Sequence, residues 1–440
     1  MRKSSRTILA LAATISMTAA ACGSDSNDAV TTVAPVATEA PAETDAPAET
    51  DAPVATDAPA ATDAPAEPAA FATDDGASSL RAALTSLLQE HVYLAGGAFE
   101  TAIDAGGDLT DPETVAAVEA LDENTVALAD AVGSVAGPEN GAAFLGLWRQ
   151  HIGFFVDYTL GEATGNEEMK TQALSDLEGY QQAAGAFFEE ITGGEIQADV
   201  LIGGLAAHVN TLTLAIDAMV ADSPEQFELL RAAGQHMFGA ANLLATGIVA
   251  ALPDTFPGAT DSAPAETRAI LTNLLQEHVY LAGFALEQAI DAGGDLENPI
   301  VGGAVAALDI NTVALADVVG SVAGPENGEA FLGLWRQHIG FFVDYTLGEA
   351  TGNEEMKAQA LTDLEGYQQA AGAFFEEITG GAIPAEALIP GLEEHVRTLT
   401  LAIDSMVAGD VAAFSQLRAA GQHMPMAALA LATGIVAATS

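Results

Sequence analysis

The chain contains one long segment twice. Residues from about 78 to 253 align without a gap on residues from about 265 to 440, at a constant offset of 187 positions. All eight histidines of the chain lie in these two copies, at four equivalent positions in each. The positions are His91, His151, His208 and His236 in the first copy, and His278, His338, His395 and His423 in the second. This placement indicates that each copy uses its four histidines for a common purpose.

The duplication predicts two tandem domains. We assign residues 77–253 and 265–440 to them, with a proline-containing linker at 254–264. A domain of roughly 175 residues is long enough to bury a core of its own. Residues 137–194 return almost letter for letter as residues 324–381, so the two copies are expected to share one fold. We also expect the first copy to fold when it is expressed alone, as residues 77–256.

The first 21 residues have the pattern of a signal peptide. Basic residues near the start precede an apolar stretch at 8–17, which is short for a membrane span. Alanines at 19–21 come directly before Cys22, the only cysteine of the chain. This arrangement resembles the bacterial lipoprotein signal, in which the thiol receives a diacylglycerol. It predicts a protein anchored through Cys22 to the outer face of the cell membrane, the alternative being an ordinary secretory signal with an incidental cysteine.

Residues 22–76 are expected to form a disordered tether. Prolines recur every six residues from Pro41 to Pro65 in a repeat of alanine, threonine and acidic residues, and the first aromatic residue is Phe71. Residues 23–76 hold 12 acidic residues and no basic one. Regular prolines and charge repulsion favour an extended chain, with a reach on the order of 120 Å. Such a tether would hold the two domains away from the membrane.

The charge of the chain limits the classes of molecule that it can bind. The formal net charge is −50 at pH 7. A surface this negative repels phosphate backbones and anionic lipid headgroups, so nucleic acid is excluded as a partner. Solubility in a salty or extracellular medium accounts for the acidity.

Both copies show the pattern of an all-α fold. Apolar residues recur at intervals of three and four, strand-like alternation is absent, and proline or glycine stands at the expected starts and stops. Six helices are predicted in the first copy, at about 78–105, 112–136, 138–163, 167–192, 198–221 and 224–251. The second copy gives the same set, shifted by 187. Short connections between helices of similar length favour two antiparallel bundles.

The histidines are predicted to lie in one layer of each bundle. Each occurs on an apolar face near the middle of its helix, and mid-helix residues meet at one height in an antiparallel bundle. The two helices without histidine present Asn124 and Tyr180 at that height, with Asn311 and Tyr367 as their copies. We therefore expect the histidines to be the candidate ligands and these four residues to surround them.

A layer of four histidines has three interpretations. Imidazoles that converge from facing helices bind transition metals, and four neutral nitrogens suit copper, zinc or iron. Two of them could instead be the axial ligands of a non-covalent haem b. In the third interpretation the histidines form a buried hydrogen-bonded network that only specifies the core, and the domains are structural or protein-interaction modules. No known catalytic motif accompanies the histidines, so an enzyme is not predicted.

Charged residues near the histidines receive simpler interpretations. Glu90 and Glu277 directly precede the first histidine of each copy and are expected to face solvent. Arg149 and Arg231 are expected to pair with acids such as Asp157 or Asp217.

Several segments resemble a known type of domain. These are EHVYLAG at 90–96, LWRQHIGFFVDYT at 147–159, AAHVNTLTLAIDAM at 206–219 and the run that begins QHMFGAA at 235. They look like an all-helical extracytoplasmic domain of secreted bacterial proteins, which has no established activity. Some of its members are labelled by association with a copper amine oxidase N-terminal-like module. The resemblance implies the same four histidines in each copy, but the amine oxidase chemistry needs a His-x-His ligand pair, which this chain lacks.

Overall fold

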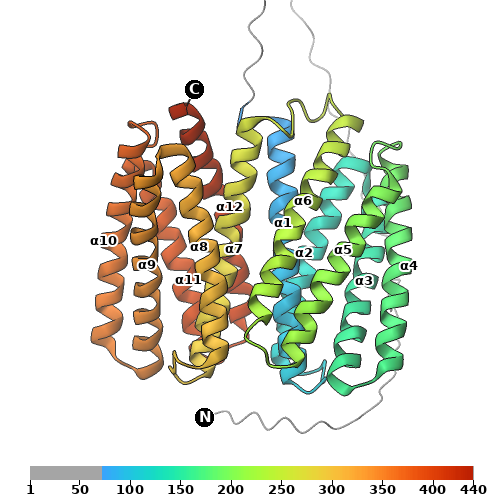
Figure 1. Cartoon of the computed structure of the whole chain (residues 1–440), viewed down its shortest axis with the longest axis horizontal. Coiled ribbons are helices and arrows are strands. Elements are labelled where there is room, and N and C mark those ends of the chain that lie inside the picture. Colours follow the sequence, from blue (N-terminus) through green and yellow to red (C-terminus); the bar gives the residue numbers. More distant parts are fainter. Residues whose placement is uncertain (1–71, 440) are drawn as a thin grey trace, which may run out of the picture. The chain divides into compact units, whose positions relative to one another are not determined.

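The computed structural model describes residues 72–439, and within them every regular element is an α-helix. The predicted signal peptide, Cys22 and the tether as far as residue 71 lie outside the described residues. Twelve helices follow one another in the described part of the chain, six from each copy (Figure 1). The predicted all-α class is therefore confirmed.

The helices of the two copies correspond one to one. The first copy forms α1 (Gly76–Asp104), α2 (Pro112–Ala136), α3 (Pro138–Thr164), α4 (Glu167–Ile191), α5 (Ala198–Val220) and α6 (Gln226–Ala251). The second forms α7 (Ala263–Asp291), α8 (Pro299–Ala323), α9 (Pro325–Thr351), α10 (Glu354–Ile378), α11 (Ala385–Ala408) and α12 (Ala412–Thr439). In the first copy, each helix begins and ends within two residues of its predicted bounds.

Local sequence explains why the helices begin and end where they do. The Asp111 side chain accepts from the backbone N–H groups of Glu113 and Thr114, and Pro112 occupies the first turn of α2. Gly165 ends α3 in the left-handed conformation, with φ 66°, which a residue with a side chain rarely adopts. Asn166 then caps α4 by accepting from the Met169 N–H. Equivalent residues perform the same roles in the second copy.

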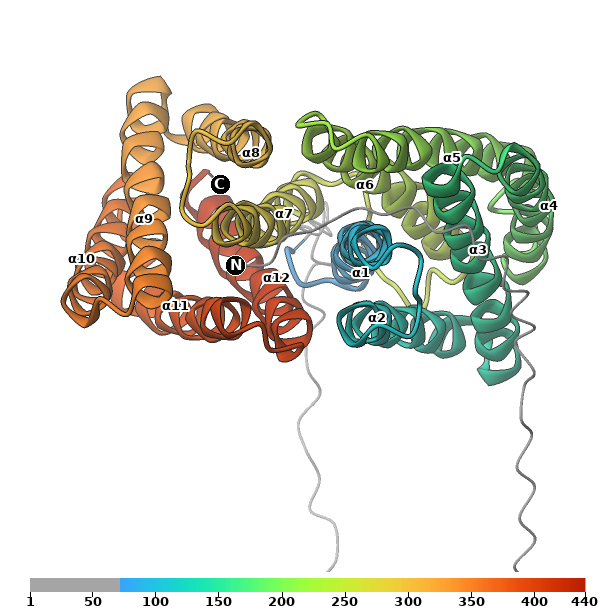
Figure 2. The same ribbon diagram turned by 90° about the horizontal axis from the view of Figure 1, so that it is seen from below.

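Each copy is a closed ring of six helices. Every helix packs against the next one in the chain, and the sixth packs back against the first, α6 on α1 and α12 on α7. Figure 2 shows these two rings, viewed along the helices. Inside the first ring α1, α3 and α5 also contact one another. Because consecutive helices are antiparallel, these three run in the same direction, so residues at equal depth along them can converge inside the ring.

The two rings pack together through α1 and α7. Equivalent residues of these helices face each other, and the rings of Tyr93 and Tyr280 stack with 5.4 Å between centroids and 11° between planes. Gly234 and Gly421 leave room for the tyrosines, since a Cβ at either position would lie 2.9 Å from a tyrosine atom. The hydrophobic core continues through both rings. Several contacts between the rings occur twice with the residues exchanged, as in a two-fold-symmetric dimer.

The prediction that Glu90 and Glu277 face solvent is wrong. They are 1% and 0% exposed, because each one lies in the contact between the rings. Glu277 accepts hydrogen bonds from Tyr93 at 3.3 Å and Asn311 at 3.1 Å, and Arg231 Nε lies 2.6 Å from its Oε1. Burial raises the pKa of Glu277 to about 7, and the Arg231 guanidinium opposes that rise. A carboxyl group that the sequence of one copy predicts to be exposed is therefore buried by contact with the other copy.

Glu90 has the reciprocal surroundings. It accepts from Tyr280 at 3.0 Å and from Asn124 at 2.7 Å, and Arg418 Nε lies 3.5 Å away. The predicted arginine pairs are corrected accordingly, since Arg231 lies against Glu277 and not against Asp157 or Asp217.

Arg149 differs from these buried arginines. It forms a two-pronged pair with Asp122 on α2, with both N···O distances at 2.7 Å. This pair is exposed to solvent, with Arg149 50% and Asp122 43% exposed.

The ends of the two copies are packed rather than free. Residues 72–76, which the sequence assigns to the tether, lie against the helices, where the buried Thr73 accepts from Arg268 and Ser78 through its carbonyl group. In the predicted linker, the Thr260 carbonyl accepts from Arg81 at 2.6 Å. The backbone of both segments therefore supplies acceptors to buried polar side chains, which fixes their course.

Acidic side chains gather where α1 and α7 end. Glu100 and Asp104 come from α1, and Glu287 and Asp291 from α7. Gln288 donates to Glu100 at 2.8 Å across the contact between the rings. Burial, together with the neighbouring carboxylates of Asp291 and Asp104, raises the pKa of Glu287 to about 8. Like charges are therefore held together at this point of the fold.

We expect Glu287→Gln to stabilise the protein at pH 8 by about 1 to 3 kcal/mol. The folded-state pKa lies above the ordinary value of 4.5, so the folded protein binds the proton more tightly. This carboxyl group therefore lowers stability as the pH rises from about 4.5 to 8. Urea unfolding at pH 5 and pH 8 measures the effect, with the exposed Glu119→Gln as the control for lost charge. An equal gain at both pH values would contradict the prediction.

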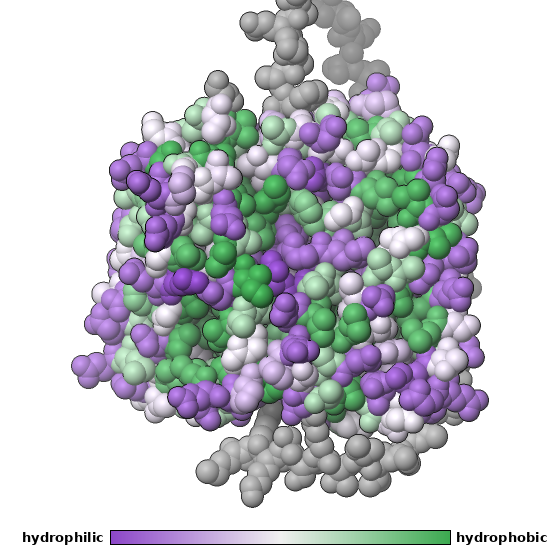
Figure 3. All heavy atoms as spheres, in the orientation of Figure 1, coloured by the Kyte–Doolittle hydropathy of each residue, from purple (hydrophilic) through white to green (hydrophobic). Residues whose placement is uncertain are grey.

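The surface of the described residues is mixed. On the face shown in Figure 3, hydrophobic groups alternate with hydrophilic ones. Two helices, α5 and α8, are long and apolar enough to cross a membrane by length and composition alone. A helix inside a bundle meets the same criterion, and each of these two packs against both of its neighbours in its ring.

Candidate metal centre

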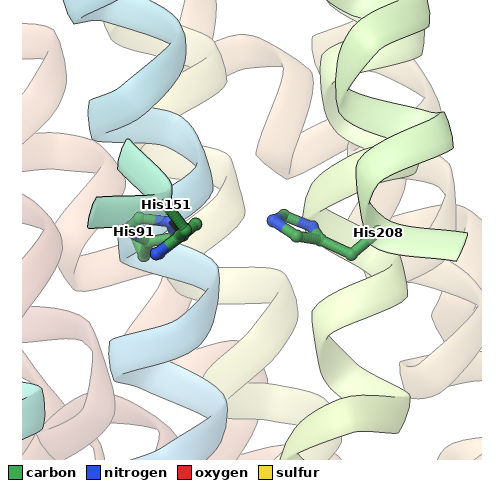
Figure 4. A group of neighbouring side chains, drawn as sticks. All are labelled: His91, His151 and His208. Carbon is green, nitrogen blue, oxygen red and sulfur yellow. Dashed lines mark hydrogen bonds between the residues drawn. The ribbon is translucent and has the colours of Figure 1, made fainter. Parts of the chain in front are cut away.

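Three histidines meet inside each ring. His91 on α1, His151 on α3 and His208 on α5 are 1%, 1% and 4% exposed. We call these three residues the His91 triad, and their copies His278, His338 and His395 the His278 triad. Figure 4 shows His91 and His151 side by side, with His208 pointing toward them from the facing helix. The convergence follows from the ring, because α1, α3 and α5 are the helices that meet across it.

The spacing of the nitrogens suits a metal ion. The Nε2 atoms of His91 and His151 are 3.4 Å apart, and those of His278 and His338 are 3.3 Å apart. Two nitrogens each 2.0 to 2.1 Å from one zinc ion, at these separations, subtend about 110°, the tetrahedral angle. The ligand atoms of all three histidines lie within 4.8 Å of one another. A shift of the His208 imidazole by about 1.4 Å or less would bring its nitrogen to the same distance and complete the three metal ligands.

Burial keeps these imidazoles neutral. Removal from water, together with a neighbouring histidine, lowers the pKa of His91 and of His208 to about 3. The pKa of His151 is lowered well below its usual range for the same reasons. In the second ring the pKa of His338 is lowered to about 3 and that of His395 to about 4. At neutral pH these imidazoles are therefore already in the neutral form that binds a metal ion.

Polar atoms in the triads lack partners. The Nδ1 atoms of His91, His208, His278 and His395 are buried and accept or donate no hydrogen bond. A buried polar atom without a partner costs about 1 to 3 kcal/mol. A metal ion bound at Nε2 would leave a proton on each Nδ1 and would not supply it with a partner. These atoms therefore do not separate a ligand site from a structural network.

Aromatic side chains surround the triad. The Tyr180 ring stacks on His151 at 4.7 Å and 18°, and the Trp148 ring lies 4.8 Å from His91. Tyr367 stacks in the same way on His338, also at 4.7 Å. Tyr180 and Tyr367 therefore lie beside the histidines of their rings. Their contribution is a stacked ring, and no hydrogen bond joins their hydroxyl groups to the histidines among the described residues.

The fourth histidine of each copy stands apart, which corrects the predicted four-histidine layer. His236 donates from Nε2 to the Gly204 carbonyl at 3.0 Å, and His423 donates to Gly391 at 2.9 Å. The His236 ring is still 6.4 Å from the His208 ring and parallel to it. His236 and His423 are therefore neighbours of the triads and not members of them.

Asn124 and Asn311 also have a different role from the predicted one. Asn124 donates to the Leu87 carbonyl at 3.0 Å and to Glu90 at 2.7 Å. Asn311 donates to Leu274 and Glu277 in the same way. Both amides hold the carboxyl groups of the contact between the rings, and neither bonds a histidine. The sequence places them at the correct height, but their helix faces point to α1 and α7 beside the histidines.

A comparison of the chain with protein-family models, curated proteins and solved structures finds no match. The resemblance to extracytoplasmic helical domains therefore stays a prediction. The geometry of the two triads is the basis for assigning a function.

Proposed function

We propose that each ring binds one transition-metal ion through its three buried histidines. The observation that carries this proposal is the Nε2 pair at 3.4 Å in the first ring and 3.3 Å in the second, with a third imidazole within 4.8 Å. Three neutral imidazoles from three helices form a preorganised set of nitrogen ligands. Because they are the only groups of this kind among residues 72–439, two ions per chain are expected.

The donor set selects the metal class. Imidazole nitrogens suit zinc, copper, iron and nickel, and they bind calcium or magnesium poorly. Three protein ligands leave the fourth tetrahedral position open for water or another molecule. Haem fits less well, since its axial histidines stand on opposite faces of a macrocycle. Here His91 and His151 contact each other, and Trp148 and Tyr180 pack directly against their rings.

The alternative function is a structural or interaction module whose histidines only specify the core. One hydrogen bond between the Nε2 atoms of His91 and His151 supports it, since one ring can donate and the other accept. In that case the protein has no metal to lose. The convergence of a third buried imidazole on this pair favours the metal site over this alternative.

Metal loading of the purified protein tests the proposal. The chain is stripped with a chelator and incubated with zinc, copper, ferrous iron or cobalt, and bound metal is counted after desalting. We expect about two ions per chain and, with cobalt, the strong visible absorption of a tetrahedral site. Hemin is added in a parallel sample, where a Soret band would favour haem. Protein that stays free of metal and haem would refute the metal site and support the structural alternative.

We further propose that the chain acts outside the cytoplasm as a lipid-anchored protein. The support comes from the sequence, in which the only cysteine follows three alanines and an apolar stretch. No protein partner is assigned, and membrane association is through the lipid alone.

Replacing Cys22 with serine is expected to abolish lipidation, because the thiol is the acceptor of the lipid. The wild-type protein should partition into the detergent phase after membrane extraction, and the variant should remain in the aqueous phase. Incorporation of a labelled fatty acid measures the modification directly. A Cys22→Ser protein that carries the same label as wild type would refute the anchor.

A further inference from the structure

The first ring encloses an apolar cavity beside its histidines. The cavity has a volume of about 280 Å³ and is lined by residues of all six helices α1–α6. Leu84, Leu128, Phe144 and Phe188 in its wall are each less than 8% exposed, so the space belongs to the interior of the ring. An apolar cavity of about 150 Å³ already stays dry and takes up benzene. The cavity in the first ring is nearly twice as large.

The polar side chains of the cavity lie at its inner end. The lining comes from the residues that precede the histidine in α1, α3 and α5, and from the later parts of α2, α4 and α6. Because neighbouring helices are antiparallel, these parts form one half of the ring, and the mid-helix histidines close it. His151, His208 and His236 line the cavity there, together with Tyr180. The rest of the wall is almost entirely hydrocarbon.

One residue of the cavity lining, on α6, is exposed to solvent. Gly239 is the exposed residue of the lining, and a Cβ placed on it would meet no atom within 4 Å. The equivalent residue of the second ring is Met426, which is 71% exposed, and it follows Pro425 inside α12. The two copies therefore differ at this position, although their triads are the same.

We propose that the cavity of the first ring binds a small neutral amphiphile, with an alkyl chain or apolar ring along the wall and a single hydroxyl group at the histidines. No ionised side chain lines the space, so a charged ligand would be buried without a partner. His208 lines the cavity, and its Nδ1 has no hydrogen-bond partner. A hydroxyl group fits this nitrogen in either tautomer, because it can donate or accept. The binding does not depend on a metal ion at the triad.

Titration with linear alcohols from six to twelve carbons tests the proposal. The chain contains two tryptophans, and Trp148 lines the cavity, so a Trp335→Phe protein reports on the first ring alone. We expect a saturable change in Trp148 fluorescence in metal-stripped protein. Affinity should rise about fourfold for each added methylene and then stop rising when the cavity is full. The alkanoate of the same length should bind at least tenfold more weakly.

A matched pair of variants locates the site. Ala184 lines the cavity and is 3% exposed, so Ala184→Phe should fill the space and abolish the fluorescence change. Ala371→Phe, at the equivalent position of the second ring, should leave it unchanged. If Ala184→Phe does not fold, Ala240→Leu in the same wall replaces it. Absence of saturable binding, binding that survives the filled cavity, or equal affinity for alcohol and alkanoate would each overturn the proposal.

Discussion

Replacing His151 with alanine is expected to lower the metal content of the chain from about two ions to about one. The substitution removes one nitrogen of the 3.4 Å pair in the first ring, while the His278 triad keeps all of its ligands. The remaining histidine of the ring, His236, bonds the Gly204 carbonyl outside the triad and is not expected to replace the lost ligand. Metal analysis after desalting, combined with a zinc competition titration, measures the loss.

His236→Ala is the matched control for this experiment. It is the same substitution in the same ring of helices. His236, however, bonds the Gly204 carbonyl and is outside the triad. The variant should therefore keep about two ions per chain. A four-ligand site would lose its metal in both variants, whereas a structural network would have no metal in either. The pair of variants separates the three-histidine site from both alternatives.

Replacing Arg231 with alanine is expected to destabilise the protein by about 3 to 5 kcal/mol. Arg231 Nε lies 2.6 Å from the carboxylate of Glu277, which is 0% exposed, and its loss leaves a buried acid without its cation. Protonation of Glu277 softens the effect at low pH, since the pKa of this group is already raised to about 7 by burial. Urea unfolding at pH 8 provides the free energy of unfolding.

Arg149→Ala is the control for the loss of an arginine. Its pair with Asp122 is about half exposed on both sides and is expected to contribute no more than about 1 kcal/mol. Similar costs for the two variants would show that the buried Arg231–Glu277 pair stabilises the protein no more than an exposed pair does. The double variant Arg231→Met with Glu277→Gln should recover most of the lost stability, because it removes both charges together.

The same contact bears on whether one copy folds alone. A fragment of residues 77–256 contains Tyr93 and Arg231 but lacks Glu277, and it exposes the face of α1 that packs on α7. Independent folding of the fragment stays a prediction, and its stability is expected to be lower than that of the full chain. The magnitude should resemble that of Arg231→Ala or exceed it, because apolar surface is exposed as well.

The sequence alone determined the helices and the height of the histidines. Asp111 before Pro112 and the glycine at 165 specify helix ends through contacts within a few residues, so the bounds of α2 and α3 are readable from the chain. A residue near the middle of a helix must lie near the middle of an antiparallel bundle. His91, His151 and His208 therefore meet at the predicted level.

Only the tertiary structure decided which side chains face one another. Adjacent residues on a helix point about 100° apart, so His91 faces the ring interior while Glu90 beside it faces the second ring. His236 is equally central on α6, yet the order of helices around the ring brings it to Gly204 and not to the other nitrogens. Periodicity specifies that a face is apolar and how far along the helix a residue lies. Which neighbour covers that face depends on packing between segments far apart in the chain, and the contact between the two copies exists only once both are folded.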